Sequence, residues 1–404
     1  MKKLFAYSRQ ILLGGLLALF LPCWASAQIE LDPIVKAGER RELQVAIVSA
    51  DSEVQVLARR AAGLHGGLKL TDEAKAQFVF RLARAGGTQV DLGILSGTPP
   101  QVLETHRAAG ATLSASVAEA MDHAVERTLG VAGFFAGEVV FAKEQGSASE
   151  LFIGDILFQN VRQITNHQSD SVLPRWRPDG QAVVYTSYFR SGFPDIFMLQ
   201  LPGGPLDTVA AFNGTNTGAT FSPRGDHMAM ILSADGSPEL FIADAQGNNP
   251  RRLTHNRSLE ATPTWSPDGT RLAFTGDPRG RPQIYLISSS GGTPQRVPTD
   301  ISGYCSEPTW HPRNPSLLAF TANIGGFFQT VLYDFNQQRS QPLTSGNVDI
   351  VEPTWLNDGR HLIVTVRENN RQRLHVLDSV TGKLAPLHSP GFGNTKQADY
   401  LKTR

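Results

Sequence analysis

The sequence predicts a mainly β protein: a six-bladed β-propeller preceded by a small α/β domain. Large aromatic residues recur at intervals of 45, 44, 45 and 45 residues, a period typical of propellers and other repeat arrays. They are Trp176, Phe221, Trp265, Trp310 and Trp355. Turn residues such as Pro267-Asp268-Gly269 follow most of them, and helical periodicity is absent from this half of the chain.

One repeat shows why the unit is a propeller blade. Apolar, β-rich runs flank the turn after Trp265, so the turn joins two strands of a hairpin. The four strands expected for this repeat are Thr262–Trp265, Leu272–Thr275, Gln283–Ile287 and Gln295–Val297. Four short antiparallel strands make one blade. We expect the aromatic residue that ends each first strand to pack between neighbouring blades.

The sixth blade is assembled from both ends of the repeat region. Before Trp176 lie candidates for a second, third and fourth strand without a first. These are Glu138–Phe141, Glu150–Ile153 and Arg162–Thr165. Counting 45 residues on from Trp355 reaches Tyr400, so we expect Ala398–Lys402 to supply the missing first strand. This pairing closes the ring and removes its open edge.

Residues 1–27 have the features of a signal peptide. Lys2 and Lys3 precede the apolar run Ile11–Leu21, and Ala25-Ser26-Ala27 forms a cleavage site before Gln28. The apolar run is too short to span a membrane. Cys23 suggests a lipoprotein as an alternative, but the preceding proline does not fit a lipidation motif. Residues 28–42 are predicted to form a flexible arm.

Charge and cysteine content exclude two classes of function. Without residues 1–27, the chain carries 34 basic and 37 acidic residues, and this balance argues against electrostatic binding to nucleic acid. Cys305 is then the single cysteine, so no internal disulfide can form. We expect Cys305 to be a buried structural thiol.

Residues 43–130 are predicted to form the small α/β domain, and residues 131–404 the propeller. The first strand, Leu43–Ser49, leads into a helix over Glu53–Ala62, whose apolar residues are Val54, Val56, Leu57 and Ala61. Ser114 or Ser116 is expected to cap a second helix that runs to about Leu129. The other expected strands are Leu68–Leu70, Phe78–Leu82, Val90–Leu95 and Val102–Thr105.

The sequence contains none of the common catalytic or nucleotide-binding motifs. There is no G-x-S-x-G, H-E-x-x-H, Walker loop or G-x-G-x-x-G. His227, His255 and His311 fall in or beside turns, where we expect solvated side chains. The Asp-Gly turns lack the alternating oxygen ligands of calcium loops, so we interpret them as structural. No cofactor and no metal are expected.

One pair of carboxylates stands out. The tetrapeptides Glu307–Trp310 and Glu352–Trp355 are identical, and both begin a predicted first strand. First strands are innermost in a propeller, so Glu307 and Glu352 should lie side by side at one mouth of the central channel. They could cap strand ends or meet basic neighbours, or they could form an acidic rim that a partner contacts. Acid–base catalysis is a third interpretation.

The export signal, arm, α/β domain and W-S-P-D-G repeats together resemble the periplasmic TolB family of the Tol–Pal system. The resemblance is strongest over Trp176–Trp355. It implies a monomeric periplasmic binding protein that binds a Pal-like peptidoglycan-associated lipoprotein on the propeller mouth and TolA through its arm. Such proteins contact the membrane only through partners and support outer-membrane integrity and cell division. The binding residues implied are Thr215, Gly218, Ala261, Thr262, Ser306, Glu307, Val351 and Glu352 at the mouth, and Ile29 and Leu31 in the arm.

Two other functions remain open from the sequence. Similar repeats occur in the propellers of prolyl-oligopeptidase-like peptidases, but no hydrolase motif accompanies them in this sequence. A periplasmic enzyme acting on glycans or peptides in the central channel is the first alternative. A structural adaptor with a different lipoprotein partner is the second.

Overall fold

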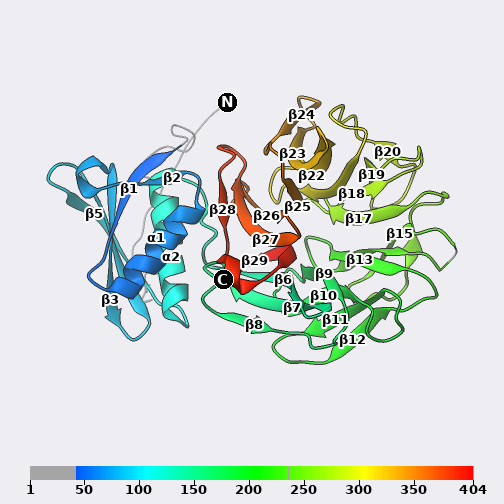
Figure 1. The fold of residues 1–404 in the computed structure, drawn as a ribbon, viewed down its shortest axis with the longest axis horizontal. Helices are drawn as coiled ribbons and strands as arrows, with labels where there is room; N and C mark the ends of the chain where they lie inside the picture. Colours follow the sequence, from blue (N-terminus) through cyan, green and yellow to red (C-terminus); the bar gives the residue numbers. More distant parts are fainter. Residues whose placement is uncertain (1–41, 235, 404) are drawn as a thin grey trace, which may run out of the picture. The chain divides into compact units, whose positions relative to one another are not determined.

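The computed structural model describes residues 42–234 and 236–403. Within them, six four-stranded antiparallel sheets follow one five-stranded sheet that is accompanied by two α-helices (Figure 1). The prediction of a six-bladed propeller preceded by a small α/β domain is confirmed. The predicted signal peptide and almost all of the predicted arm, with Ile29 and Leu31, lie outside the described residues. No helix in the described part is both long and apolar enough to cross a membrane.

The first sheet has the strand order β2-β1-β3-β4-β5. Its central strand β1 runs parallel to β2 and β3, and β3, β4 and β5 form an antiparallel meander. The strands are β1 (Leu43–Val48), β2 (Leu68–Leu70), β3 (Phe78–Gly86), β4 (Gln89–Ser96) and β5 (Gln101–Ala108). The helices are α1 (Ser52–Leu64) and α2 (Leu113–Leu129), with a short 3-10 turn at Glu73–Lys75. Side chains of both helices and of the sheet share one apolar core.

Two expectations for the helices were wrong. The cap of α2 is Thr112, whose hydroxyl accepts the Ala115 N–H at 3.2 Å. Ser114 lies inside the helix and donates to Asp155, while the Ser116 hydroxyl accepts the Gly110 N–H. In α1, Val56 is 65 % exposed, because helical geometry turns it away from the face that carries Val54, Leu57 and Ala61.

The six remaining sheets are the blades, and each has its first strand innermost. Blade one contains β29 (Thr395–Lys402), β6 (Gly137–Gln145), β7 (Ala148–Asp155) and β8 (Val161–Gln163), and blade two contains β9 (Ser171–Trp176), β10 (Ala182–Ser187), β11 (Asp195–Gln200) and β12 (Leu206–Ala210). Blade three contains β13 (Asn216–Phe221), β14 (His227–Leu232), β15 (Glu239–Asp244) and β16 (Arg251–Arg252), and blade four contains β17 (Glu260–Trp265), β18 (Arg271–Gly276), β19 (Gln283–Ser288) and β20 (Gln295–Arg296). Blade five contains β21 (Cys305–Trp310), β22 (Leu317–Ile324), β23 (Phe327–Asp334) and β24 (Arg339–Pro342), and blade six contains β25 (Asp349–Trp355), β26 (His361–Glu368), β27 (Arg371–Asp378) and β28 (Leu384–Pro386), followed by a 3-10 turn at Pro390–Phe392.

Blade one joins the two ends of the propeller, as the sequence predicted. Strand β29 pairs antiparallel with β6, and Tyr400 lies opposite Val139. The closing strand begins at Thr395, earlier than the expected Ala398. The Tyr400 hydroxyl also donates to the Phe134 carbonyl at 2.9 Å, which ties the closing strand to the segment that leads into the propeller.

The repeated aromatic residues pack between blades, as expected. Trp265 lies in one cluster with Ile231 and Leu240 of the preceding blade, and its indole N–H donates to the Thr220 carbonyl at 3.2 Å. The turn after it is structural, because the Asp268 carboxylate accepts the Thr270 N–H at 3.0 Å. Hydrogen bonds from Ser266 and Thr270 lower the pKa of Asp268 to about 2. Cys305 is buried, as predicted.

The expectation for His311 was wrong. Its side chain is buried instead of solvated, and its Nδ1 accepts the N–H groups of Arg313 and Asn314 at 3.1 and 2.9 Å. This repeat has histidine where others have serine, and the imidazole ring stabilises the turn from inside. His227 and His255 are exposed, in agreement with the prediction.

Candidate partner-binding mouth and channel

The third or fourth residue of every first strand has a left-handed backbone, with φ between 47° and 64°. These residues are Leu173, Gly218, Thr262, Glu307, Glu352 and Gln397, one from each blade. The pairing of first and second strands is interrupted by a bulge at each of them. Bulges re-aim side chains, and here they create a ring of six residues around the channel, which we call the bulge ring.

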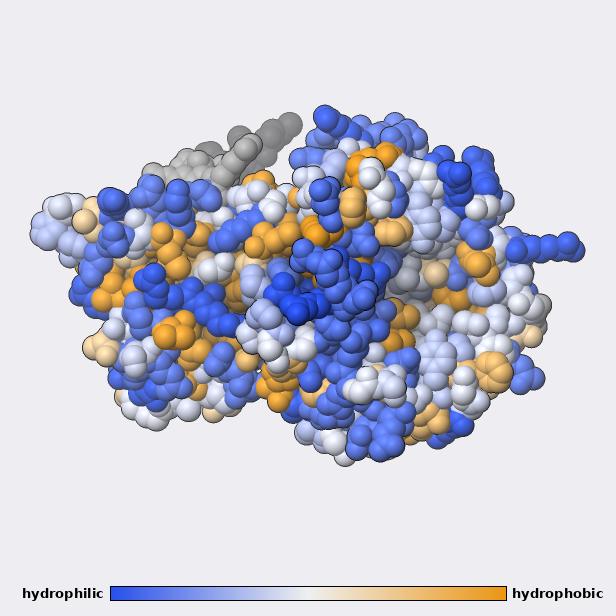
Figure 2. All heavy atoms as spheres, in the orientation of Figure 1, coloured by the Kyte–Doolittle hydropathy of each residue, from blue (hydrophilic) through white to orange (hydrophobic). Residues whose placement is uncertain are grey.

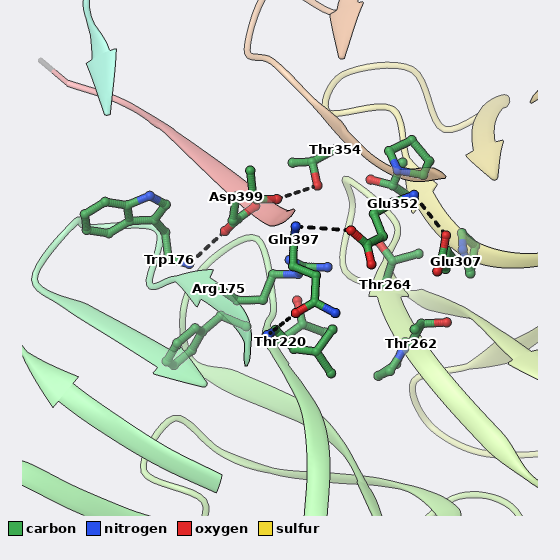
Figure 3. A pocket seen from close by; sticks show the side chains of 17 residues that line it. Arg175, Trp176, Thr220, Thr262, Thr264, Glu307, Glu352, Thr354, Gln397 and Asp399 are labelled. Carbon is green, nitrogen blue, oxygen red and sulfur yellow. Dashed lines mark hydrogen bonds between the residues drawn. The ribbon is translucent and has the colours of Figure 1, made fainter. Parts of the chain in front are cut away.

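Side chains of the bulge ring connect neighbouring blades (Figure 3). Glu307 Oε2 accepts the Glu352 N–H at 2.9 Å, and Glu352 Oε2 accepts the Gln397 N–H at 3.1 Å. Gln397 Oε1 then accepts the Leu173 N–H at 3.1 Å. Three successive side chains therefore bind the backbone of the next blade, and this relay spans the blade that closes the propeller.

Glu307 and Glu352 lie side by side, as predicted, and each has further partners. Thr321 donates to Glu307 at 2.7 Å, and Thr365 donates to Glu352 at 2.7 Å. Glu352 also forms a salt bridge with Arg367, so it does meet a basic neighbour. Burial, reinforced by the negative charge of Glu352, raises the pKa of Glu307. A proton on Glu307 is thus held more tightly than on a solvated glutamate.

A second ring lies two residues further along each first strand. Its members are Arg175, Thr220, Thr264, Thr309, Thr354 and Asp399. The two rings line a cavity of about 230 Å³ in the channel. Asp399 accepts the Trp176 N–H at 2.7 Å, and its pKa is raised by burial, an effect that the positive charge of Arg175 opposes. Arg175 and Asp399 come from adjacent blades (Figure 3).

The predicted mouth residues all belong to the beginnings of first strands, in blades three to six. Thr262, Glu307 and Glu352 line the cavity, and Gly218 occupies the equivalent position in blade three. Thr215, Ala261 and Ser306 are partly exposed at the same end of the strands. Val351 is only 2 % exposed, so its side chain lies beneath the surface that a partner could reach.

Sequence reasoning missed four residues that complete the rings. Gln397 and Leu173 belong to the bulge ring, and Arg175 and Asp399 to the second ring. The repeat spacing could have found Gln397, which lies 45 residues after Glu352, and Leu173, 45 residues before Gly218. The missing signal was chemical, because glutamine and leucine do not resemble glutamate in a motif search.

The loops around the mouth carry exposed apolar side chains. Five of the nine large exposed hydrophobic residues in the described chain lie in loops at the bulge-ring end: Tyr188, Phe193, Phe212, Leu259 and Tyr304. They belong to blades two to five, and we call them the apolar rim. Hydrophilic residues cover much of the face drawn in Figure 2, with smaller apolar patches among them. Exposed aromatic residues are enriched at protein interfaces.

One buried group in the described chain has the residue types of a metal site. His65, Asp358 and His361 bring ligand atoms within 4.8 Å of one another. However, His361 Nδ1 binds Asp358 at 2.5 Å and its Nε2 accepts the Gly66 N–H at 3.1 Å. His65 Nδ1 accepts the Gly67 N–H. These bonds join the α/β domain to blade six, and we assign the group that role.

Comparison with known proteins gives a consistent result. The family described as "TolB beta propeller domain" matches residues 125–398. The "Tol-Pal system protein TolB" of Desulfosudis oleivorans is 31 % identical over 132 residues, which cover 33 % of this chain and 30 % of that protein. The match thus spans about a third of the length of this curated relative.

Solved structures agree on the fold. The crystal structure of TolB from Acinetobacter baumannii superposes with a TM-score of 0.77 at 19 % identity, and covers 89 % of this chain and 96 % of that one. A putative TolB from Agrobacterium tumefaciens gives a TM-score of 0.52 at 18 % identity, covering 63 % of this chain and 89 % of that one. The family match covers more than half of the sequence, and the chain therefore belongs to the TolB beta propeller family.

Proposed function

We propose that this protein is a non-enzymatic, monomeric binding component of a Tol–Pal system in the periplasm. A Pal-like lipoprotein docks on the mouth around Thr215, Gly218, Ala261, Thr262, Ser306, Glu307, Val351 and Glu352. TolA binds the arm, residues 28–42, through Ile29 and Leu31. No cofactor is required, and the protein reaches membranes only through these partners. Its role is to support outer-membrane integrity and cell division.

The observation that carries the proposal is the relay of hydrogen bonds in the bulge ring. Glu307, Glu352 and Gln397 each bind the next blade, so the mouth is a preformed surface that loses little conformational freedom when a partner docks. Partner binding also explains why apolar side chains are exposed around the mouth. A buried position for Val351 limits its contribution to supporting the surface from beneath.

Calorimetric titration with the lipid-free domain of the Pal lipoprotein from the same organism tests the mouth. Ser306→Arg places a bulky side chain at the mouth, and Ser290→Arg, in the exposed loop after β19 at the other end of blade four, is its matched control. We expect at least about a tenfold loss of affinity for the first variant and none for the second. Equal affinities for both variants would contradict docking at the mouth.

Removal of residues 28–39 tests the arm. We expect this truncation to abolish TolA binding. If the arm also competes for the propeller or its domain, the truncation changes the affinity for Pal as well, because coupling between two sites is reciprocal. Unchanged Pal affinity would remove that linkage, and retained TolA binding would remove the proposed role of the arm.

An enzyme acting in the channel is a second candidate, favoured by the raised pKa of Glu307 beside a cavity. The bonding argues against it, because an oxygen of each carboxylate already holds the amide of the next blade. Incubation of the protein with peptidoglycan fragments and periplasmic peptides should give no turnover. Turnover that disappears in Glu307→Gln, in a variant that still folds, would favour the enzyme.

A further inference from the structure

Two phenylalanines of the apolar rim are held at one corner of the mouth. Phe193 is 64 % exposed and lies in the loop between β10 and β11 of blade two. Phe212 is 45 % exposed and lies in the loop that enters β13 of blade three. Exposed aromatic rings are unfavourable in water, and mobile loops could hide them against the surface. The structure instead fixes the loops that carry both.

The fixing residue is Asn216, which is fully buried. Its side-chain oxygen accepts the Phe212 N–H at 3.2 Å, and its amide nitrogen donates to the Phe212 carbonyl at 2.8 Å. The same nitrogen lies 3.3 Å from the Pro194 carbonyl, next to Phe193, and the Asn216 backbone N–H donates to that carbonyl at 3.0 Å. One buried amide therefore holds loops from two different blades.

Positive charge surrounds this rim. The described residues of the rim loops in blades two to five carry Arg190, Arg257, Arg279 and Arg281, all exposed, against the acidic Asp277 and Asp300. Asp277 is already used inside the protein, where it accepts the Leu259 N–H at 2.7 Å. An apolar corner within a basic rim is complementary to an apolar patch bordered by carboxylates.

The α/β domain leaves this corner uncovered. Its printed hydrogen bonds to blade six and the closing strand involve Asn357 and Lys402, at the end of the first strands opposite to the bulge ring. The Phe193 and Phe212 loops belong to blades two and three. They are continuous with the mouth residues Thr215 and Gly218 of the proposed function, since Phe212 lies three residues before Thr215.

We propose that Phe193 and Phe212 form the principal contact of the mouth, held in place by Asn216, and that they dock onto an acidic-bordered apolar patch of a folded protein partner. The proposal rests on the proposed function and assigns the binding energy to the corner between blades two and three. Aromatic residues with rigid backbones contribute most per residue to interfaces. In this arrangement the carboxylates of the bulge ring support the mouth from blades five, six and one.

Titration with the lipid-free Pal domain tests the corner directly. Phe193→Ala combined with Phe212→Ala should weaken binding about 30-fold or more. Val102→Ala combined with Leu103→Ala removes two exposed apolar side chains from β5 of the α/β domain, and this control should change affinity less than about twofold. Unchanged binding by the Phe variant would overturn the inference and leave the proposed function intact. If the unaltered protein does not bind Pal at all, both fail together.

A double-mutant cycle tests the positioning role of Asn216. If Asn216 acts through the two rings, Asn216→Ala weakens Pal binding in the unaltered protein and has no further effect when both phenylalanines are already alanine. A purely structural residue would lower affinity equally in both backgrounds, and that result would overturn its assignment. Hydrogen exchange of the Phe212 amide, which Asn216 accepts, reports whether the loop has loosened.

Discussion

The two halves of the bulge ring are built differently. In blades five, six and one, Glu307, Glu352 and Gln397 pass hydrogen bonds from blade to blade. In blades two and three the equivalent residues are Leu173 and Gly218, which have no polar side chain to do this. The phenylalanine pair lies over the second half. The comparison teaches that one side of the mouth is bonded inward, where the propeller closes, while the other presents its side chains outward.

The largest expected effect comes from breaking the inward-bonded half. Glu352→Ala removes the acceptor for the Gln397 N–H and leaves Arg367 without its carboxylate. We expect a loss of about 3 kcal/mol in the free energy of unfolding, since both groups lose a charged partner. Thr262→Ala in blade four, which loses a single Thr262–Thr275 hydroxyl contact, should cost about 1 kcal/mol or less. Urea unfolding of both variants makes the comparison, and equal losses would refute the asymmetry.

The outward half can be tested through its charge. Arg279→Glu with Arg281→Glu reverses two exposed charges of the rim in blade four. We expect the association rate with the Pal domain to fall about tenfold at low salt, with a smaller change in the dissociation rate. Surface plasmon resonance at two salt concentrations measures this. A change confined to dissociation would show that these arginines act by contact and not by steering.

A smaller effect concerns pH and the loop of Leu259. Glu260, directly after it, is buried beside Glu239, and burial together with that neighbouring carboxylate raises the pKa of Glu260 to about 7. Because the folded state holds this proton more tightly than the unfolded chain, the contribution of Glu260 to stability is present below its unfolded pKa. That contribution is lost as pH rises through about 7.

Melting temperatures between pH 5 and 8 measure this effect. The unaltered protein should lose stability across this range, and Glu260→Gln should lose less. The turn residue Asp268 gives the opposite sign, because its pKa is lowered to about 2 and its contribution disappears as pH falls toward that value. A Glu260→Gln variant with the same pH slope as the unaltered protein would show that another group titrates.

The sequence was sufficient for the fold because its signals are local and repeated. The spacing of the aromatic residues predicted the blades, and the missing first strand before Trp176 predicted that β29 pairs with β6. The adjacency of Glu307 and Glu352 followed from the same register. Register also places Gln397 and Leu173, but their place in the ring depends on a shared backbone conformation that no motif marks.

The outward half of the mouth could not be predicted in this way. Phe193 and Phe212 lie in loops of different blades, and an apolar residue in a loop can be buried or exposed. Their exposure depends on Asn216, whose contacts are set by the packing of blade two against blade three. His311 shows the same limit, because its burial depends on contact with the Gly359 carbonyl of the next blade.

Hydrogen exchange of the protein with and without the Pal domain tests the central claim most directly. The mouth is proposed to bind a folded partner through its outward half. Amides in residues 188–194 and 211–218 should therefore become protected on binding, while the loop at residues 378–383, at the opposite end of blade six, should not change. Protection confined to residues 378–383 or to the α/β domain would contradict the account.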